Sequence, residues 1–125
     1  MSKPEKLGIR FSEYSQWHRT LGDGCYGVDL DWVEYRANRG IVALIDVTGN
    51  LNDEEHIINS KKMIWRRTEM QREILETIAK ALGVPAYFVI HTTDLQMFHV
   101  HNLACGLKDY ARLTRYQYTE FVKSL

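Results

Sequence analysis

Two apolar runs joined by a short polar turn constrain the fold of this chain more than any other feature. Residues 28–35 and 41–48 are rich in aliphatic, β-branched and aromatic side chains, and Asn38 and Gly40 lie between them. Such side chains favour strands, whereas Asn and Gly suit tight turns. The stretch therefore predicts a β-hairpin.

Both predicted strands carry aspartates within their apolar runs. Because side chains alternate along a strand, Asp29 and Asp31 share one face of the first strand. Asp46 and Thr48 likewise share one face of the second. Aspartate is depleted in strands, and a buried carboxylate is unfavourable unless something compensates its charge. Three converging carboxylates would suit a hard divalent cation, so we expect Mg²⁺ or Mn²⁺ here.

The composition limits the class of protein. With 125 residues the chain is long enough for its own apolar core, and we expect a single domain over residues 1–125. Its 16 Lys and Arg residues balance 16 Asp and Glu residues, which argues against non-specific adhesion to nucleic acid or acidic membranes. The N-terminus is charged, no apolar run reaches membrane-span length, and the two cysteines form no CxxC pair. We therefore expect a cytoplasmic protein with reduced thiols and no membrane partner.

Further elements are predicted on both sides of the hairpin. Residues 12–20 favour a short helix, with a serine able to cap its start. The polar segment 49–59 has no clear period and is expected to be a loop. From 60 to 82, apolar residues recur mostly at three- and four-residue steps, which predicts one long amphipathic helix that ends at Gly83.

The remaining elements complete the predicted fold. Residues 86–91 and 96–101 predict two more strands, and the apolar spacing within 118–125 favours a closing helix. The order α-β-β-α-β-β-α, with the long helix as a crossover, predicts an α/β fold in which helices flank a mixed β-sheet.

The succession of these motifs resembles that of the PD-(D/E)XK nuclease superfamily. The shared features span residues 12–101: a leading helix, an Asp-bearing strand, a hairpin into apolar-Asp-x-Thr, a helix bearing Gln, and an apolar strand that begins at Pro. The resemblance implies a restriction-endonuclease-like core. It also implies a metal-dependent nuclease that hydrolyses phosphodiester bonds of nucleic acid, with DNA favoured over RNA and Mg²⁺ or Mn²⁺ as cofactor.

The resemblance also implies roles for individual residues. Asp31 matches the first acidic residue of the superfamily, with Asp29 as the neighbouring choice, and Asp46 matches the second. Glu13 occupies a place comparable to an acidic residue on the leading helix that often completes the metal site. Gln71 matches a glutamine that several branches carry on the following helix.

Thr48 stands where the resemblance predicts lysine. A lysine ammonium would orient or help deprotonate the attacking water and offset the charge on the phosphate, whereas a threonine hydroxyl carries no charge. Either a cation from the start of the next helix replaces the lysine, or hydrolysis is lost and the fold serves as a binding or regulatory module for nucleic acid or a protein partner. A third hypothesis is a subunit that is complete only as a homodimer.

Basic residues near the expected start of the long helix form a predicted nucleic-acid contact. This cluster contains Lys61, Lys62, Arg66 and Arg67, with Trp65 among them. Such residues can hold a phosphate backbone or stack on a base, and cations in a first helical turn would oppose the helix dipole. His18 and Arg19, at the end of the first helix, are further candidates, although cations at a helix C-terminus also have a structural explanation.

The histidines allow an alternative zinc site. His99 and His101 alternate on one predicted strand face, His91 belongs to the neighbouring predicted strand, and Cys105 follows closely. This spacing matches no common zinc motif, and Asp-rich strands suit harder metals. The sequence therefore favours Mg²⁺ or Mn²⁺ over zinc.

Overall fold

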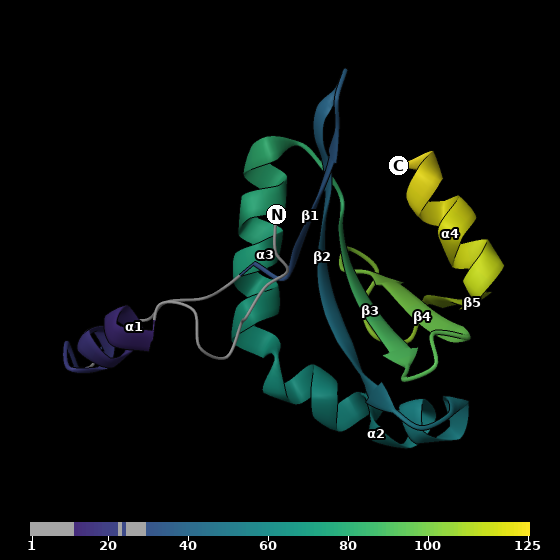
Figure 1. Ribbon diagram of the computed structural model, residues 1–125, viewed down its shortest axis with the longest axis horizontal. Coiled ribbons are helices and arrows are strands. Elements are labelled where there is room, and N and C mark those ends of the chain that lie inside the picture. The colour runs from purple at the N-terminus through teal and green to yellow at the C-terminus, as the bar shows by residue number, and fades with distance from the viewer. Residues whose placement is uncertain (1–11, 23, 25–29) are drawn as a thin grey trace.

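A five-stranded mixed β-sheet with helices on both faces organises the computed structural model, which describes residues 12–22, 24 and 30–125 (Figure 1). The strands are β1 (Trp32–Arg36), β2 (Gly40–Leu51), β3 (Ala86–Thr92), β4 (Met97–Asn102) and β5 (Tyr110–Thr114). The helices are α1 (Ser12–Arg19), α2 (Glu54–Arg67), α3 (Glu69–Leu82) and α4 (Arg115–Ser124). The predicted α/β fold with a mixed, helix-flanked sheet is confirmed at this level.

The strands follow one another across the sheet in chain order, from β1 to β5. Neighbouring strands are antiparallel, except that β2 and β3 are parallel. A parallel pair needs a crossover that returns the chain to the same end of the sheet, and α2 and α3 together provide it. Within the described residues, β1 and β5 are the two edge strands.

The register aligns side chains in rows across the sheet. One row runs from β2 to β5 through Asp46, Phe88, His101 and Tyr110. The adjacent row runs through Thr48, Ile90, His99 and Arg112. Residues paired across neighbouring strands point to the same face of a sheet. Both rows therefore belong to one face, which α2 and α3 cover.

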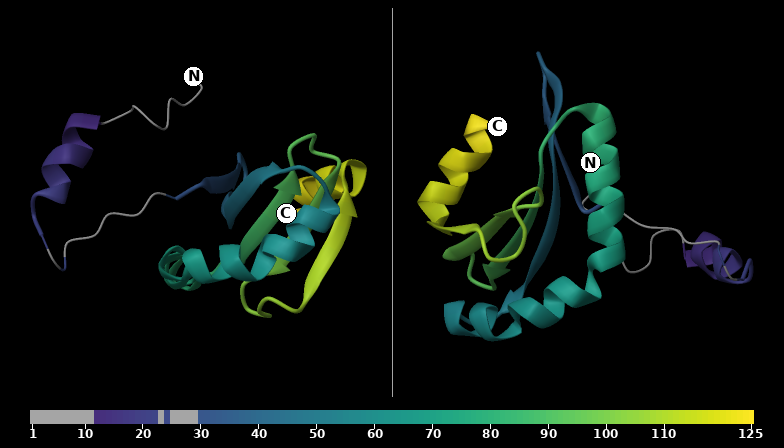
Figure 2. Two further views of the ribbon diagram at one scale, coloured as in Figure 1. Left: turned by 90° about the horizontal axis from the view of Figure 1, so that it is seen from below. Right: turned by 180° about the vertical axis from the view of Figure 1, so that it is seen from behind.

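Two apolar clusters hold the layers together, one on each face of the sheet. The cluster under α2 and α3 includes Leu44, Phe88 and Ile90 of the sheet with Ile57 and Leu75 of the helices. The cluster on the other face includes Ile45, Val89, Phe98 and Val100 of the sheet, with Tyr118 and Phe121 of α4 packed against it. Figure 2 shows α3 and α4 on opposite sides of the strands.

The predicted hairpin forms as an antiparallel pair of β1 and β2, with Trp32 opposite Ile45. β1 begins at Trp32, later than expected, and residues 28 and 29 lie outside the described residues. β2 continues to Leu51, beyond the expected end at residue 48. The hairpin thus positions the residues on which the predicted metal site depends.

The predictions of a loop over 49–59 and of one long helix were wrong. α2 begins at Glu54 because the Asp53 side chain caps it, accepting from the backbone N–H of His56 at 2.9 Å. The helix ends at Thr68, whose backbone N–H and hydroxyl both donate to the carbonyl of Ile64. From there α3 runs in a clearly different direction (Figure 1).

The structure also adds a strand that the sequence analysis did not predict. β5 has only five residues, four of them exposed, so its sequence lacks the alternation that marks a half-buried strand. The observed order is therefore α-β-β-α-α-β-β-β-α. Among the described residues, none of the helices is both long and apolar enough to cross a membrane.

Candidate functional site

Asp31 and Asp46 lie side by side at the β1 edge of the face that α3 covers. Asp31 directly precedes Trp32, which pairs with Ile45, so the register places Asp31 opposite Asp46. Asp31 Oδ2 accepts a hydrogen bond from the backbone N–H of Val47 at 3.0 Å. The carboxyl group of Asp31 also acts on that of Asp46, whose pKa it raises. The hairpin therefore brings together two of the carboxylates expected to converge.

Asp46 is the more buried member of this acid pair. Its residue is 9% exposed, and its Oδ2 atom is buried without a hydrogen-bond partner among the described residues. Burial, followed by the hydrogen bond and the negative charge of Asp31, raises the pKa of Asp46 to about 7. Near neutral pH the acid pair therefore favours the binding of a positively charged species, either a proton or a metal cation.

Arg72 of α3 carries a positive charge that acts on Asp46. Its positive charge lowers the pKa of Asp46, in opposition to burial. The guanidinium group stacks 3.7 Å from the ring centroid of Trp65. It donates to the backbone carbonyl of Trp65 and to Thr68 Oγ1, the latter at 3.1 Å. Arg72 is thus a buried cation that the end of α2 holds within electrostatic reach of Asp46.

Sequence reasoning missed Arg72, although one signal for it was present. Arg72, Leu75 and Ala79 recur at helical spacing, and all three are buried. A charged residue within the buried stripe of a helix requires a partner in the layer beneath it. The chain alone does not reveal that Arg72 acts on Asp46, because 26 residues separate the two positions.

The other residues predicted for the metal site lie in different places. Thr48 is half-buried on the same face of β2 as Asp46, one row further along the sheet. Gln71 is exposed on α3, next to Arg72 in the chain. Glu13 is exposed on α1, which Figure 1 shows apart from the sheet, so it does not complete the acid pair in this conformation. Asp29 lies outside the described residues.

The acid pair offers two carboxylates as candidate metal ligands. Among the described residues, no three His, Cys, Asp or Glu side chains gather closely enough to hold a metal ion. The residues considered for zinc do not converge. His91 packs against Phe98 on the α4 face, His99 and His101 belong to the α3 face, and Cys105 is exposed. Mg²⁺ is commonly bound by one or two carboxylates with water and phosphate, and two carboxylates suffice for that arrangement.

The predicted basic cluster is divided by burial. Lys61 is buried, whereas Lys62, Arg66 and Arg67 are exposed. The helix-dipole argument for an anionic ligand was wrong, because α2 begins at Glu54 and not near residue 60. Lys61 and Lys62 therefore lie in mid-helix, and Arg66 and Arg67 occupy the last turn, where cations are favourable. His18 and Arg19 occupy the last turn of α1.

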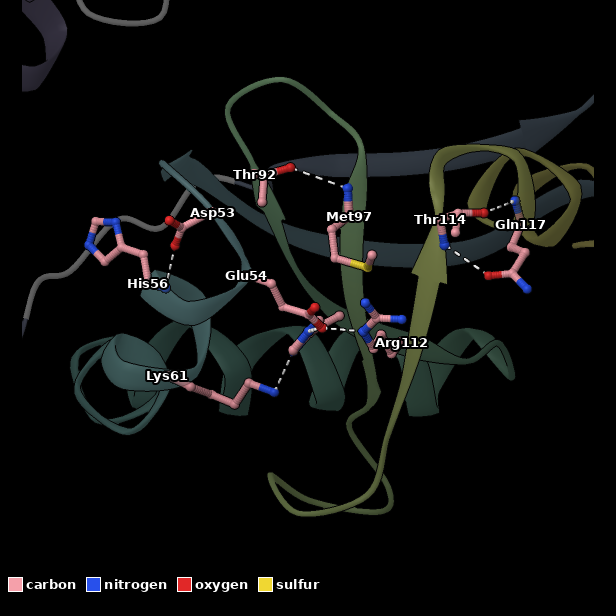
Figure 3. Close-up of polar contacts among 10 residues, drawn as sticks. Asp53, Glu54, His56, Lys61, Thr92, Met97, Arg112, Thr114 and Gln117 are labelled. Carbon is pink, nitrogen blue, oxygen red and sulfur yellow. Dashed lines mark hydrogen bonds and ion pairs between the residues drawn. The ribbon is translucent and has the colours of Figure 1, made fainter.

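Lys61 joins a buried polar network (Figure 3). Its Nζ lies 2.8 Å from His99 Nδ1 and 3.3 Å from the ring centroid of Tyr110. His99 Nε2 lies 2.8 Å from Glu54 Oε2, which also accepts from Arg112 Nε. Because Lys61 and Glu54 bond opposite ring nitrogens, we assign a neutral His99 that accepts at Nδ1 and donates at Nε2.

Burial determines the charge states in this network. Burial lowers the pKa of Lys61 to about 8 and also lowers the pKa of His99. Hydrogen bonds from Arg112 and His99 lower the pKa of Glu54 to about 2. The network therefore contains a negative Glu54 between two positive groups at neutral pH. It fastens α2 to β4 and β5, and its members are too far apart in sequence for a local motif to reveal it.

A groove that Arg72 helps to line contains part of the basic cluster. It has a volume of about 530 Å³ and lies between the α2–α3 corner and Leu107. Its lining consists of the cations Lys62, Arg66 and Arg72, the carboxylates Glu69, Glu73 and Glu76, and the side chains of Trp65 and Leu107. Arg72 thus lines this groove and also acts electrostatically on Asp46.

Comparisons with known proteins add no assignment to this geometry. The chain matches no protein-family model, no curated protein sequence and no solved structure.

Proposed function

We propose that the acid pair Asp31–Asp46 binds Mg²⁺ or Mn²⁺ and that the protein uses it to hydrolyse phosphodiester bonds of nucleic acid. The observation that carries the proposal is the buried, unpartnered Oδ2 atom of Asp46 beside a second carboxyl group. An unpartnered buried carboxylate oxygen is unfavourable, and a divalent cation would satisfy it while neutralising both charges. The resemblance to PD-(D/E)XK nucleases supports the same assignment.

The residues around the acid pair suit this chemistry. A bound divalent cation would polarise a phosphoryl oxygen and lower the pKa of nearby water. Asp31 and Asp46 would hold the cation at the sheet edge, where Asp31 is open to solvent. Arg72 contributes a permanent positive charge, which Thr48 cannot provide, and would offset negative charge on the phosphate. Arg72 therefore becomes the candidate for the role of the missing lysine. It takes the place of the four cations that the sequence offered, Lys61, Lys62, Arg66 and Arg67.

Binding of the nucleic-acid backbone is assigned to the exposed basic residues of α2. Lys62 and Arg66 line the groove that borders Arg72, and Arg67 is exposed in the same helical turn. Cations in such positions neutralise phosphates without reading the base sequence. We favour DNA over RNA as the substrate, as the resemblance implies.

Replacement of Asp46 by Asn tests the proposed cation site. The amide keeps the size of the side chain but removes its charge, so titration calorimetry should show Mg²⁺ and Mn²⁺ binding to the parent protein and none to Asp46→Asn. Cleavage of labelled single-stranded, duplex and branched DNA should be lost in parallel. Asp109→Asn is the matched control, because Asp109 is an exposed aspartate outside the site. Metal-dependent cleavage that survives Asp46→Asn would contradict the assignment.

A second candidate function is a non-catalytic binding module on the same scaffold. It is favoured by the way Arg72 is held, because its guanidinium bonds Trp65 and Thr68 and not the carboxylates. A protein of this kind would bind DNA through Lys62, Arg66 and Arg67 without needing a metal ion. DNA binding that is unchanged by chelator and by Asp46→Asn, with no cleavage, would favour this module over the nuclease.

A further inference from the structure

A second cavity lies on the α4 face of the sheet, opposite the face that contains Asp46. It has a volume of about 430 Å³ and is bounded by side chains of β1 to β4 and of the second half of α4. Trp32 and Leu95 in its lining are 58% and 39% exposed, so the cavity opens to solvent. A pocket of this size can hold a whole small molecule.

Four aromatic rings form much of the wall of this aromatic pocket. They belong to Trp32, His91, Phe98 and Tyr118. Phe98 and Tyr118 stack with their ring centroids 4.1 Å apart, and the His91 ring lies 5.5 Å from that of Phe98. The face of an aromatic ring carries partial negative charge, so such rings attract cations. The wall therefore favours a positively charged ligand over a negatively charged one.

Glu34 supplies a full negative charge to the same pocket. Within the described part of the chain it is the only carboxylate in the lining, and neither lysine nor arginine lines the pocket. Glu34 accepts from Trp32 Nε1 at 2.7 Å and from Arg36 Nη1 at 2.9 Å. Two carboxylate oxygens can accept about four hydrogen bonds, so acceptor sites remain. The bond from Trp32 also fixes the indole ring beside the carboxylate.

Arg36 does not cancel the effect of Glu34 on the aromatic pocket. Its guanidinium group is outside the lining and also donates to the backbone carbonyls of Tyr35 and Val122. Burial, followed by the negative charge of Glu34, raises the pKa of the Tyr118 phenol to about 12. Because Tyr118 lines the pocket, the negative charge of Glu34 acts inside it.

Gly49 of β2 allows the His91 ring to form part of this wall. A Cβ atom at position 49 would lie 2.5 Å from His91 Cε1, so any other residue would displace the ring. His91 Nδ1 also donates to the carbonyl of Thr92 at 2.8 Å, which fixes the ring from a second side. The wall is thus formed before a ligand arrives, and this lowers the ordering cost of binding.

We propose that the aromatic pocket binds a small organic cation in which an ammonium nitrogen carries alkyl groups. Buried charge is unfavourable unless it is paired, and Glu34 would pair with this cation. The aromatic faces would contact its alkyl groups, as in other sites that recognise quaternary ammonium compounds. The inference is independent of the proposed function, because it uses neither the acid pair nor the basic residues of α2.

Choline and its uncharged isostere, in which a tert-butyl group replaces the trimethylammonium group, test the assignment. Both are titrated into isotopically labelled protein without metal or nucleic acid. The indole N–H resonance of Trp32, identified by its absence from Trp32→Phe, reports binding. Choline should shift this resonance saturably, and the isostere should bind about tenfold more weakly. No saturable shift with choline, or equal affinity for the two compounds, would overturn the proposal.

Glu34→Gln separates the charge of this residue from its structural role. The amide keeps the size of the side chain and can still accept from Trp32. Affinity for choline should therefore fall about tenfold, whereas affinity for the isostere should not change. Glu120→Gln is the matched control, because Glu120 is an exposed glutamate of α4 outside the lining. Equal loss of affinity for both compounds in Glu34→Gln would overturn the role of its charge.

Val122→Phe tests the location of the site without altering any charge. The larger side chain on α4 should fill the aromatic pocket, so the variant should bind neither compound. Val33→Phe makes the same change on the opposite face of β1 and should bind both as the parent does. Circular dichroism verifies that each variant folds. Choline binding that persists in folded Val122→Phe would overturn the proposal, whereas absence of Mg²⁺ binding would affect only the proposed function.

Discussion

At the scale of single residues, Asp46 carries an energetic cost that its surroundings do not fully offset. Burial and the adjacent Asp31 raise its pKa to about 7, so the folded protein binds a proton there more tightly than the unfolded chain does. The resulting stabilisation is fully present below pH 3.8 and is lost as the pH rises through about 7. Above that pH the charged pair destabilises the fold unless a cation is bound.

Asp46→Asn should therefore stabilise the metal-free protein at pH 8. The asparagine cannot ionise and its amide can donate to Asp31, so we expect a gain in unfolding free energy on the order of 2 kcal/mol. The gain should shrink as the pH falls towards 5, where Asp46 is protonated in the folded parent. Urea denaturation at the two pH values in the presence of chelator measures both. A variant that is less stable than the parent at pH 8 would show that the carboxylate is compensated within the protein.

The candidate site was partly predictable from its residues. Alternation along the hairpin predicts that Asp31 and Asp46 face the same way, and the register confirms that they are neighbours. The approach of Arg72 depends on how α3 crosses the sheet, which no local pattern encodes. The same holds for the contact between Lys61 and His99, which are 38 residues apart.

At the scale of elements, the position of α2 explains why Lys61 is not a surface residue. Sequence periodicity predicts a helix over much of this region, but the cap at Asp53 sets its start several residues earlier than expected. The break at Thr68 involves neither Gly nor Pro, so no standard helix breaker marks it. β5 is short and exposed, and it is recognised only by its pairing with β4. The hairpin, the central strands and the closing helix follow from patterns that are local.

Lys61→Met should destabilise the protein because it leaves buried polar groups without their partner. Methionine keeps most of the side-chain length, but His99 Nδ1 loses its donor and Tyr110 loses its cation. We expect a loss of about 1–3 kcal/mol in unfolding free energy, the usual cost of an unsatisfied buried polar group. Lys62→Met, one residue away and exposed, should change stability by less than about 0.5 kcal/mol.

Chemical denaturation of these two lysine variants, together with DNA-binding measurements, distinguishes the roles of the two side chains. The Lys62 variant should weaken DNA binding with little change in stability. The Lys61 variant should lose stability with little change in DNA binding. Weaker DNA binding by a fully stable Lys61→Met protein would instead support Lys61 as a nucleic-acid contact, as the sequence analysis predicted.

At the scale of the whole molecule, the face under α2 and α3 combines an apolar core with buried histidines. His99 and His101 belong to adjacent rows of that face and are both fully buried. Burial, together with the charge of Lys61, lowers the pKa of His101 to about 4. The unfolded chain therefore binds protons that the folded chain excludes, so these histidines reduce stability as the pH falls from about 6.5 to about 4.

His101→Phe should make the fold less sensitive to acid. The phenyl ring suits a pocket that already contains Trp65, Phe88 and Tyr110, and it has no site for a proton. We expect the melting temperature of the variant to fall less than that of the parent between pH 6.5 and pH 4. The opposing effect of Asp46 is common to both proteins and cancels in the comparison. Parallel melting curves over this range would show that His101 does not limit acid stability.

The hydrogen bond from the Val47 amide to Asp31 links the acid pair to the integrity of one edge strand. Asp31 directly precedes the edge strand β1, whereas Asp46 is anchored in the interior strand β2. Strand edges open more readily than the interior of a sheet, so β1 can fray while the layers around β2 and β3 remain packed. Such local fraying would dismantle the pair without global unfolding, and protection of the Val47 amide from hydrogen exchange would record how often the site is assembled.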